Sequence, residues 1–196
     1  VLLAAGLDTR AYRLQWNAGT TVYELDAPKV LEFKDRVLAD QGARPQCRRQ
    51  IVGCDLREDW CSALQQMGFD SSRPTAWLAE GLLPFLSDEA QDNLFTQVHQ
   101  LSVTNSQIAA ECLSVNLAAL SRQPIFENMA QEFGIDIPES QPDGRRYDPE
   151  AGLVNRGWTA STSPASSVAE NYHRPLDGTI PLLELFRSNL LLTANL

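Results

Sequence analysis

The chain has 196 residues, 43% of them hydrophobic, which is enough for one domain with a sizeable core. Its formal net charge of −9 disfavours nucleic acid as a partner. No apolar run reaches the roughly 18 residues that a membrane span requires. None of the four cysteines belongs to a CxxC pair, and no histidine lies near them at the spacing of metal ligands. We therefore expect neither a metal site nor a disulfide framework. A reduced, cytoplasmic setting is expected instead.

The opening residues predict a strand that ends in a tight turn. An apolar run over residues 1–5 breaks at Gly6 and is followed at once by Asp8, Thr9 and Arg10. A second strand is predicted over residues 20–25 and closes on Asp26. A turn after the first strand and an acid after the second are typical of a site for a nucleotide-type cofactor. Since the chain starts within a predicted strand, we expect a natural segment to precede it.

Strand and helix patterns then alternate along the chain, which predicts an α/β fold with a doubly wound sheet and ligands at the carboxyl ends of the strands. Residues 113–133 continue in a helical pattern, and residues 138–149 are typical of an exposed loop. Further strands are predicted over residues 50–54, 74–79, 106–111, 157–162 and 188–193, and helices over residues 27–41, about 60–68, from 88 onward after an N-cap at Ser87, and over 164–172.

The residues of the first turn favour one cofactor class over another. A dinucleotide site typically has the pattern GxGxxG, but the three glycine positions of that pattern are occupied here by Ala4, Gly6 and Thr9. A carboxylate at Asp8 would repel a pyrophosphate, although Arg10 offsets part of that charge. S-adenosylmethionine has no phosphate and carries two cationic groups. It suits a pocket ringed by acids at or just beyond four strand ends: Asp8, Asp26, Asp55 and Glu80.

These residues also resemble a known family. Residues 3–14, LAAGLDTRAYRL, are similar to the first motif of the leucine carboxyl methyltransferase superfamily, and more closely to that of a bacterial branch of S-adenosylmethionine-dependent methyltransferases. Residues 23–28, 55–60 and 79–83 match later motifs of that branch in order and spacing. The resemblance implies a Rossmann-like class I methyltransferase fold, with a seven-stranded, mostly parallel sheet and helices on both faces. Residues 1–196 would form one domain, with a helical insertion over residues 113–147 that shapes the acceptor pocket.

The resemblance further implies S-adenosylmethionine as the cofactor and a role for matching residues. Asp26 would accept bonds from the ribose hydroxyls, and Asp55 and Leu56 would hold the adenine. Glu80 would face the methionine end of the cofactor, above the turn from Ala4 to Gly6. Ala4 replaces the family's first glycine, and the family's basic residue for the methionine carboxylate lies upstream of the first motif, outside this chain.

The expected reaction is methyl transfer to a small molecule, by in-line displacement at the sulfonium methyl group. A carboxylate acceptor would need no general base, whereas a hydroxyl would. No catalytic residue is assigned, because His99 and His173 both fit structural roles. One alternative is a nicotinamide-dependent oxidoreductase, against which Asp8 and the broken glycine pattern argue. Another is a non-catalytic binding protein, against which the four retained acids argue.

Overall fold

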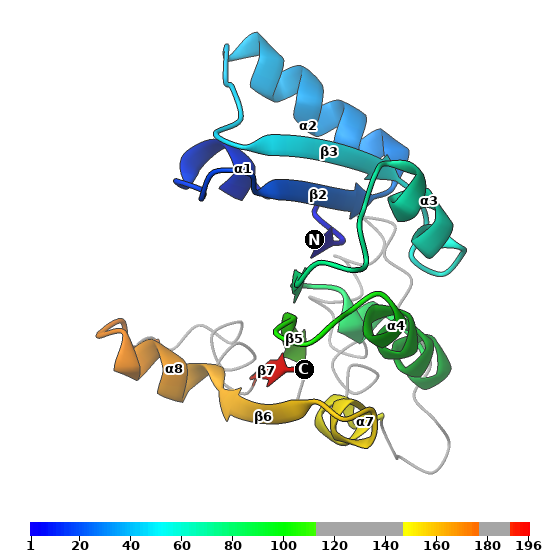
Figure 1. The fold of residues 1–196 in the computed structure, drawn as a ribbon. Coiled ribbons are helices and arrows are strands. Elements are labelled where there is room, and N and C mark those ends of the chain that lie inside the picture. Colours follow the sequence, from blue (N-terminus) through cyan, green and yellow to red (C-terminus); the bar gives the residue numbers. More distant parts are fainter. Residues whose placement is uncertain (113–146, 177–188) are drawn as a thin grey trace, which may run out of the picture.

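The structure, a computed structural model, describes residues 1–112, 147–176 and 189–196 (Figure 1). Strands from these ranges form a seven-stranded sheet in the order β3-β2-β1-β4-β5-β7-β6. Strand β7 runs antiparallel to β5 and β6, and the other pairings are parallel. The seven-stranded, mostly parallel sheet predicted from the sequence is confirmed.

The elements alternate as the sequence predicts. In chain order they are β1 (Leu2–Leu3), α1 (Arg10–Arg13), β2 (Thr21–Asp26), α2 (Pro28–Asp40), β3 (Arg48–Gly53), α3 (Trp60–Gln66), β4 (Ala76–Ala79), the 3-10 helix η1 (Leu83–Phe85), α4 (Asp88–Gln100), β5 (Gln107–Cys112), α7 (Pro149–Asn155), β6 (Thr159–Pro164), α8 (Ala165–Asn171) and β7 (Leu190–Asn195).

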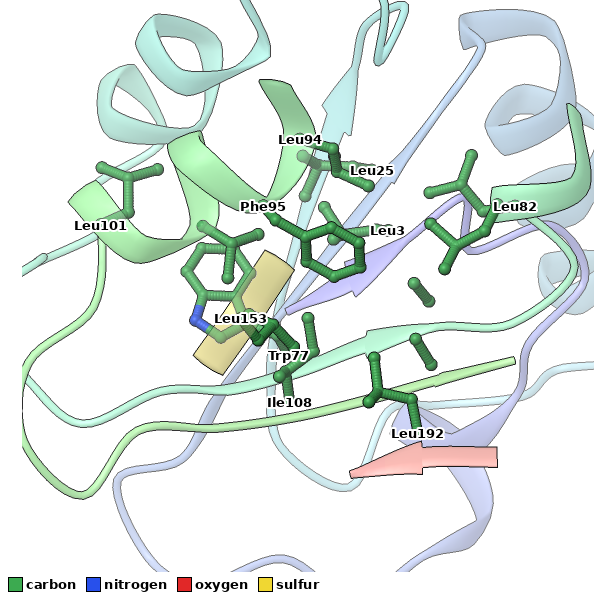
Figure 2. Close-up of a cluster of buried hydrophobic side chains, with 14 of the residues drawn as sticks. Leu3, Leu25, Trp77, Leu82, Leu94, Phe95, Leu101, Ile108, Leu153 and Leu192 are labelled. Atoms are coloured by element: carbon green, nitrogen blue, oxygen red, sulfur yellow. The ribbon is translucent and has the colours of Figure 1, made fainter. Parts of the chain in front are cut away.

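One face of the sheet carries the main hydrophobic core, which α3, α4 and α7 cover. Phe95 of α4 is fully buried and lies among Leu3, Leu25 and Trp77 of the sheet (Figure 2). The ring of Trp60 in α3 meets that of Trp77 edge-on, with centroids 6.2 Å apart. Alternation along each strand explains this core, because every second side chain points to the same face.

The opposite face carries α1 and α2. Leu2 and Val22 point to this side and form a smaller cluster with Ala5 and Ala11. Figure 1 shows α2 running beside β2 and β3 at one end of the sheet, while β6 and α8 lie at the other end. Pro28 is the first residue of α2, a position that suits proline because the N–H missing there would have no helical partner.

Register brings the carboxyl ends of the parallel strands to one edge. Leu3 is level with Leu25 of β2 and with Ala79 of β4, and Asp26 is level with Gly53 of β3. The residues that follow these strands therefore meet at the same edge, where α/β sheets bind ligands.

Helix α7 was not predicted from the sequence. The loop expected over residues 138–149 gives way to a helix at Pro149, after an N-cap at Asp148 whose side chain accepts a bond from the Ala151 N–H at 3.1 Å. Leu153 of this helix is fully buried in the main core. Burial of that apolar side chain stabilises the helix, which begins at the last residue of the expected loop; residues 138–146 of that loop lie outside the described residues.

The predicted strand over residues 157–162 begins at Thr159, and the one over 188–193 begins at Leu190. Gly157, at a φ of 87°, completes the turn after α7 and so delays β6. The helix predicted over residues 113–133 and nearly all of the 113–147 insertion lie outside the described residues. Within the described ranges, no helix has the length and apolar character needed to cross a bilayer.

Candidate functional site

The turn after β1 uses backbone conformations that glycine adopts most easily. The φ angle is 57° at Ala4 and 46° at Gly6. The Asp8 N–H donates to the Ala5 carbonyl at 2.8 Å and closes the turn. A Cβ placed on Gly6 would meet no heavy atom within 4 Å. Backbone conformation is therefore what favours glycine here, and the space beside it is open.

Hydrogen bonds of Asp26 link this turn to the end of β2. Its Oδ2 accepts a bond from the Gly6 N–H at 2.7 Å, and its Oδ1 accepts one from the Ala27 N–H at 2.7 Å. A carboxylate offers about four acceptor positions, so about two remain available to a ligand. Asp26 is only half-buried, which leaves those positions accessible.

Arg10 joins the acids that follow β1 and β4. Its Nη1 donates to Asp8 Oδ2 and, at 2.6 Å, to Glu80 Oε2, while its Nη2 donates to Glu80 Oε1 at 3.2 Å. The hydrogen bond to Glu80 raises the pKa of Arg10 above its ordinary value. Two of the four predicted acids thus share one guanidinium group, which neutralises part of the negative charge expected at this edge.

A cavity of about 420 Å³ lies beside the turn. Its volume falls within the roughly 300–1,000 Å³ of small-molecule sites. Four of the seven predicted cofactor-binding residues line it: Ala4, Gly6, Asp8 and Glu80. Asp26 is joined to this lining through its bond to Gly6. The structure therefore brings five of the predicted residues together.

Asp55 and Leu56 stand apart from that cavity. They follow β3 at the same edge, and the Cys54 N–H donates to the Asp26 carbonyl at 3.0 Å, so the ends of β2 and β3 are joined. Hydrogen bonds from Arg57 lower the pKa of Asp55 to about 2. Leu56 packs against the main core. Their predicted role at the adenine stays a prediction.

A buried ion-pair cluster, Glu24–Lys34–Arg49, contacts the turn after β1. Glu24 is fully buried in β2, and its Oε2 lies 2.6 Å from Lys34 Nζ and 2.6 Å from Arg49 Nη2. Lys34 Nζ also donates to the Asp8 carbonyl at 3.2 Å. Helix α2 is thereby connected both to β2 and to the turn that lines the cavity.

A fifth acid occupies the same edge. Glu111, near the end of β5, accepts bonds from the Gly81 N–H at 3.1 Å and from Asn189 Nδ2 at 2.5 Å. An acid at the end of the fifth predicted strand was a signal that could have identified it. The ion pairs of Arg10 with both Asp8 and Glu80 could not be recognised in this way, because Glu80 is 70 residues away from Arg10 in the sequence.

A second cavity, of about 580 Å³, reaches the opposite edge of the sheet. Thr21, Arg48 and Ala76, the first residues of β2, β3 and β4, contribute to it together with Trp16 and Phe69. The predicted cofactor residues do not line it.

Comparison with known proteins places these motifs in a family. Residues 1–99 match the model of the family described as leucine carboxyl methyltransferase. A protein of Saccharopolyspora erythraea named "Putative S-adenosyl-L-methionine-dependent methyltransferase" is 48% identical over 176 residues, which cover 90% of this chain and 61% of that protein. A protein of Mycobacteroides abscessus with the same name is 44% identical over 199 residues, covering 99% and 66%. The chain thus spans less than two thirds of the length of these relatives.

Solved structures with the same fold are more distant in sequence. The magnesium protoporphyrin IX methyltransferase of Synechocystis, solved with bound SAH, has a TM-score of 0.56 at 12% identity, and the match covers 99% of this chain and 71% of that one. A DUF574 family protein from Streptomyces avermitilis has a TM-score of 0.56 at 17% identity, covering 89% and 64%. At these identities the likeness concerns the fold alone.

The family model covers the stretch that contains the turn after β1, Asp26, Asp55 and Glu80. The resemblance first visible in residues 3–14 is therefore confirmed, and the chain belongs to the leucine carboxyl methyltransferase family.

Proposed function

We propose that the protein is an S-adenosylmethionine-dependent methyltransferase that holds its cofactor at the carboxyl edge of the sheet, between β1, β2 and β4. One observation carries the proposal. Asp26 is bonded to the Gly6 N–H beside an open cavity, with acceptor positions still available at the end of β2. An acid in this place can take both ribose hydroxyls while the glycine turn lets the cofactor approach the backbone.

The residues present fit this cofactor. S-adenosylmethionine brings sulfonium and ammonium cations, and the cavity lining includes the carboxylates of Asp8 and Glu80. The open space at Gly6 would be narrowed by any larger residue. The same acids disfavour a pyrophosphate, which argues against a nicotinamide dinucleotide even though Arg10 offsets part of their charge.

The chain's own residues would bind and orient rather than perform covalent chemistry. The bound cofactor supplies an electrophilic methyl group. Asp26 would fix the ribose, Asp55 and Leu56 the adenine, and Glu80 the methionine end. Alignment for in-line displacement and exclusion of water are then the chain's contributions to rate.

We further propose a small molecule as the methyl acceptor, methylated on a carboxylate or hydroxyl oxygen. The description of the family, which names a carboxyl methyltransferase, supports an oxygen acceptor. A carboxylate is already a nucleophile and needs no general base, whereas a hydroxyl does. The net charge of −9 argues against nucleic acid as the acceptor.

The four cysteines are free, which supports the expected cytoplasmic setting.

Calorimetric titration with S-adenosylhomocysteine tests the proposal, with NAD⁺ titrated in parallel. We expect binding of the first ligand only. Asp26→Asn keeps an acceptor for Gly6 but loses the charge, so it should weaken binding about 30-fold, the equivalent of about 2 kcal/mol of charge-assisted hydrogen bonding. Asp40→Asn, at the exposed end of α2, is the matched control. Binding of NAD⁺ would favour the oxidoreductase, and binding of neither ligand would favour a non-catalytic member.

A further inference from the structure

We propose that the 580 Å³ cavity is a slot for one strand, filled in the natural protein by the segment that precedes Val1. Bound there, the segment continues β1 by two residues between β2 and β4. Strand β1, which begins at the point marked N in Figure 1, has two residues, whereas β2 has six and β4 has four. Both neighbours extend past the start of β1. The inference is independent of the proposed function, and its test needs no cofactor.

The register of the sheet shows where the slot lies. Leu2 is level with Glu24, the fourth residue of β2, and with Leu78, the third residue of β4. Val1 takes the position before these in each ladder. Two positions of β2 and one of β4 therefore have no residue of β1 beside them. All three of these residues line the cavity: Thr21, Val22 and Ala76.

Two hydrogen bonds show which backbone groups face the slot. The Val1 amino group donates to the Ala76 carbonyl at 2.7 Å, so the backbone groups of Ala76 point toward β1. The Ala5 N–H donates to the Leu25 carbonyl at 2.9 Å, so Leu25 faces β1, and so does Tyr23, two residues before it. The N–H and C=O of one strand residue point to the same side. The N–H groups of Tyr23 and Ala76 therefore point into the slot.

An extended segment would satisfy the backbone groups of the slot. In a parallel ladder, the residue directly before Val1 donates to the Thr21 carbonyl and accepts from the Tyr23 N–H. The residue before that one donates to the Pro74 carbonyl and accepts from the Ala76 N–H. All four partners line the cavity. Because backbone groups inside proteins are nearly always paired, two donors and two acceptors at ladder spacing favour a strand over a small molecule.

The segment would also find apolar surface on both faces of the sheet. Side chains alternate along a strand, so the residue directly before Val1 points the same way as Leu2, to the side of Val22 and Trp16. The residue before that one points to the other side, where Phe69 packs against the main core. Trp16 and Phe69 both line the cavity. We therefore expect apolar side chains at both places.

A segment of the same chain fits the slot better than a separate molecule does. This sequence spans less than two thirds of the length of its relatives, so further chain is available in proteins of this kind. A segment joined to Val1 by a peptide bond is already positioned at the slot. Its binding costs less translational and rotational entropy than that of a second molecule.

The test is amide hydrogen exchange, followed by NMR, in the full-length protein with its upstream segment. The N–H groups of Tyr23 and Ala76 report on the slot. Those of Val22 and Trp77 are the matched controls, because adjacent residues of a strand point to opposite sides, here toward β3 and β5. We expect Tyr23 to exchange as slowly as Val22, and Ala76 as slowly as Trp77, within about tenfold.

Replacing the residue directly before Val1 by proline or by alanine sharpens the test. Proline removes the N–H that bonds to Thr21, whereas alanine keeps it. The proline variant should speed exchange at Tyr23 relative to Val22 by about 30-fold or more, and the alanine variant by less than about threefold. If the proline variant does not fold, nuclear Overhauser effects in the unaltered protein, from the residue directly before Val1 to Val22 and Ala76, decide the question.

Fast exchange of Tyr23 and Ala76 in the full-length protein, beside protected Val22 and Trp77, would overturn the inference, because the slot would then be open. Protection that rises with protein concentration would overturn it too, since a second copy would supply the strand. Protection that is lost on exhaustive dialysis would identify a small molecule as the occupant instead. Equal exchange rates in the proline and alanine variants would contradict pairing in the ladder.

Discussion

Two ion-pair clusters in this protein use the same chemistry in different surroundings. In the buried cluster Glu24–Lys34–Arg49, the side chains of Glu24 and Lys34 are 0% and 2% exposed. In the open pair formed by Arg10 with Glu80, the side chains are 27% and 53% exposed. Each cluster joins segments that are distant in sequence, and each reaches the turn after β1.

Burial gives the two clusters different roles. A charge without water must keep its partner, because losing it leaves an uncompensated charge in a medium of low dielectric constant. A charge in contact with water can change partners at little cost. The buried cluster therefore fixes the position of the turn, whereas the open pair lies accessible at the cavity.

The largest effect is expected from Lys34→Met, which breaks the buried cluster. Glu24 would keep only Arg49 as a partner, and the Asp8 carbonyl would lose a donor. We expect a loss of about 3 kcal/mol in the free energy of unfolding, measured by urea denaturation. Lys29→Met, on the exposed side of the same helix, is the matched control.

The double variant Glu24→Gln with Lys34→Met sharpens that result. Removing both charges should recover part of the loss, since the charges of the cluster are then balanced again and Arg49 keeps its ion pair with Asp35. If the single variant unfolds at the same urea concentration as the unaltered protein, the buried cluster does not stabilise the fold.

Gly6→Ala tests the turn itself. A residue with a Cβ at a φ of 46° costs about 1–2 kcal/mol of stability. The new methyl group also points into open space beside the cavity, where it would meet a ligand. Affinity for S-adenosylhomocysteine should therefore fall in addition to stability. Loss of stability with unchanged affinity would mean that the ligand does not approach this turn.

Ala4→Gly is expected to act in the opposite direction on stability. Ala4 holds a φ of 57°, at the place of the family's first glycine, so glycine relieves its backbone strain. The gain should be at most about 1 kcal/mol, because glycine also makes the unfolded chain more flexible. A decrease in the midpoint of thermal unfolding would contradict the strain argument.

The smallest effect is expected at Asp55. Its pKa in the folded chain is about 2, below the ordinary value of 3.8, so its bond to Arg57 adds stability above about pH 4 that is lost as the pH falls through 2. Because the side chains are 39% and 74% exposed, Asp55→Asn should cost less than about 1 kcal/mol at pH 7. Urea titrations at pH 7 and pH 2 should show that small difference vanishing at the lower pH.

The sequence predicts well what local chemistry decides. The N-cap at Ser87 is confirmed by its bond from the Ala90 N–H at 3.2 Å, and β2 ends on Asp26 as expected. Helix α7 could have been predicted too, since Asp148 and Pro149 are a good N-cap and first helical residue.

Contacts between distant segments could not be predicted in this way. Nothing near Glu24 in the sequence indicates that a charged strand residue is buried against Lys34 and Arg49, because that depends on how α2 and β3 pack. The bridge from Arg10 to Glu80 depends likewise on β1 lying beside β4. Local patterns thus predicted the acids of the candidate site, whereas the partners of those acids depend on the fold.

A structure of the protein with bound S-adenosylhomocysteine tests the central claim most directly. We expect the ribose beside Asp26 and the methionine end of the ligand in the 420 Å³ cavity, beside Glu80. Ligand in the 580 Å³ cavity, beside Trp16 and Arg48 near the amino ends of the strands, would contradict it.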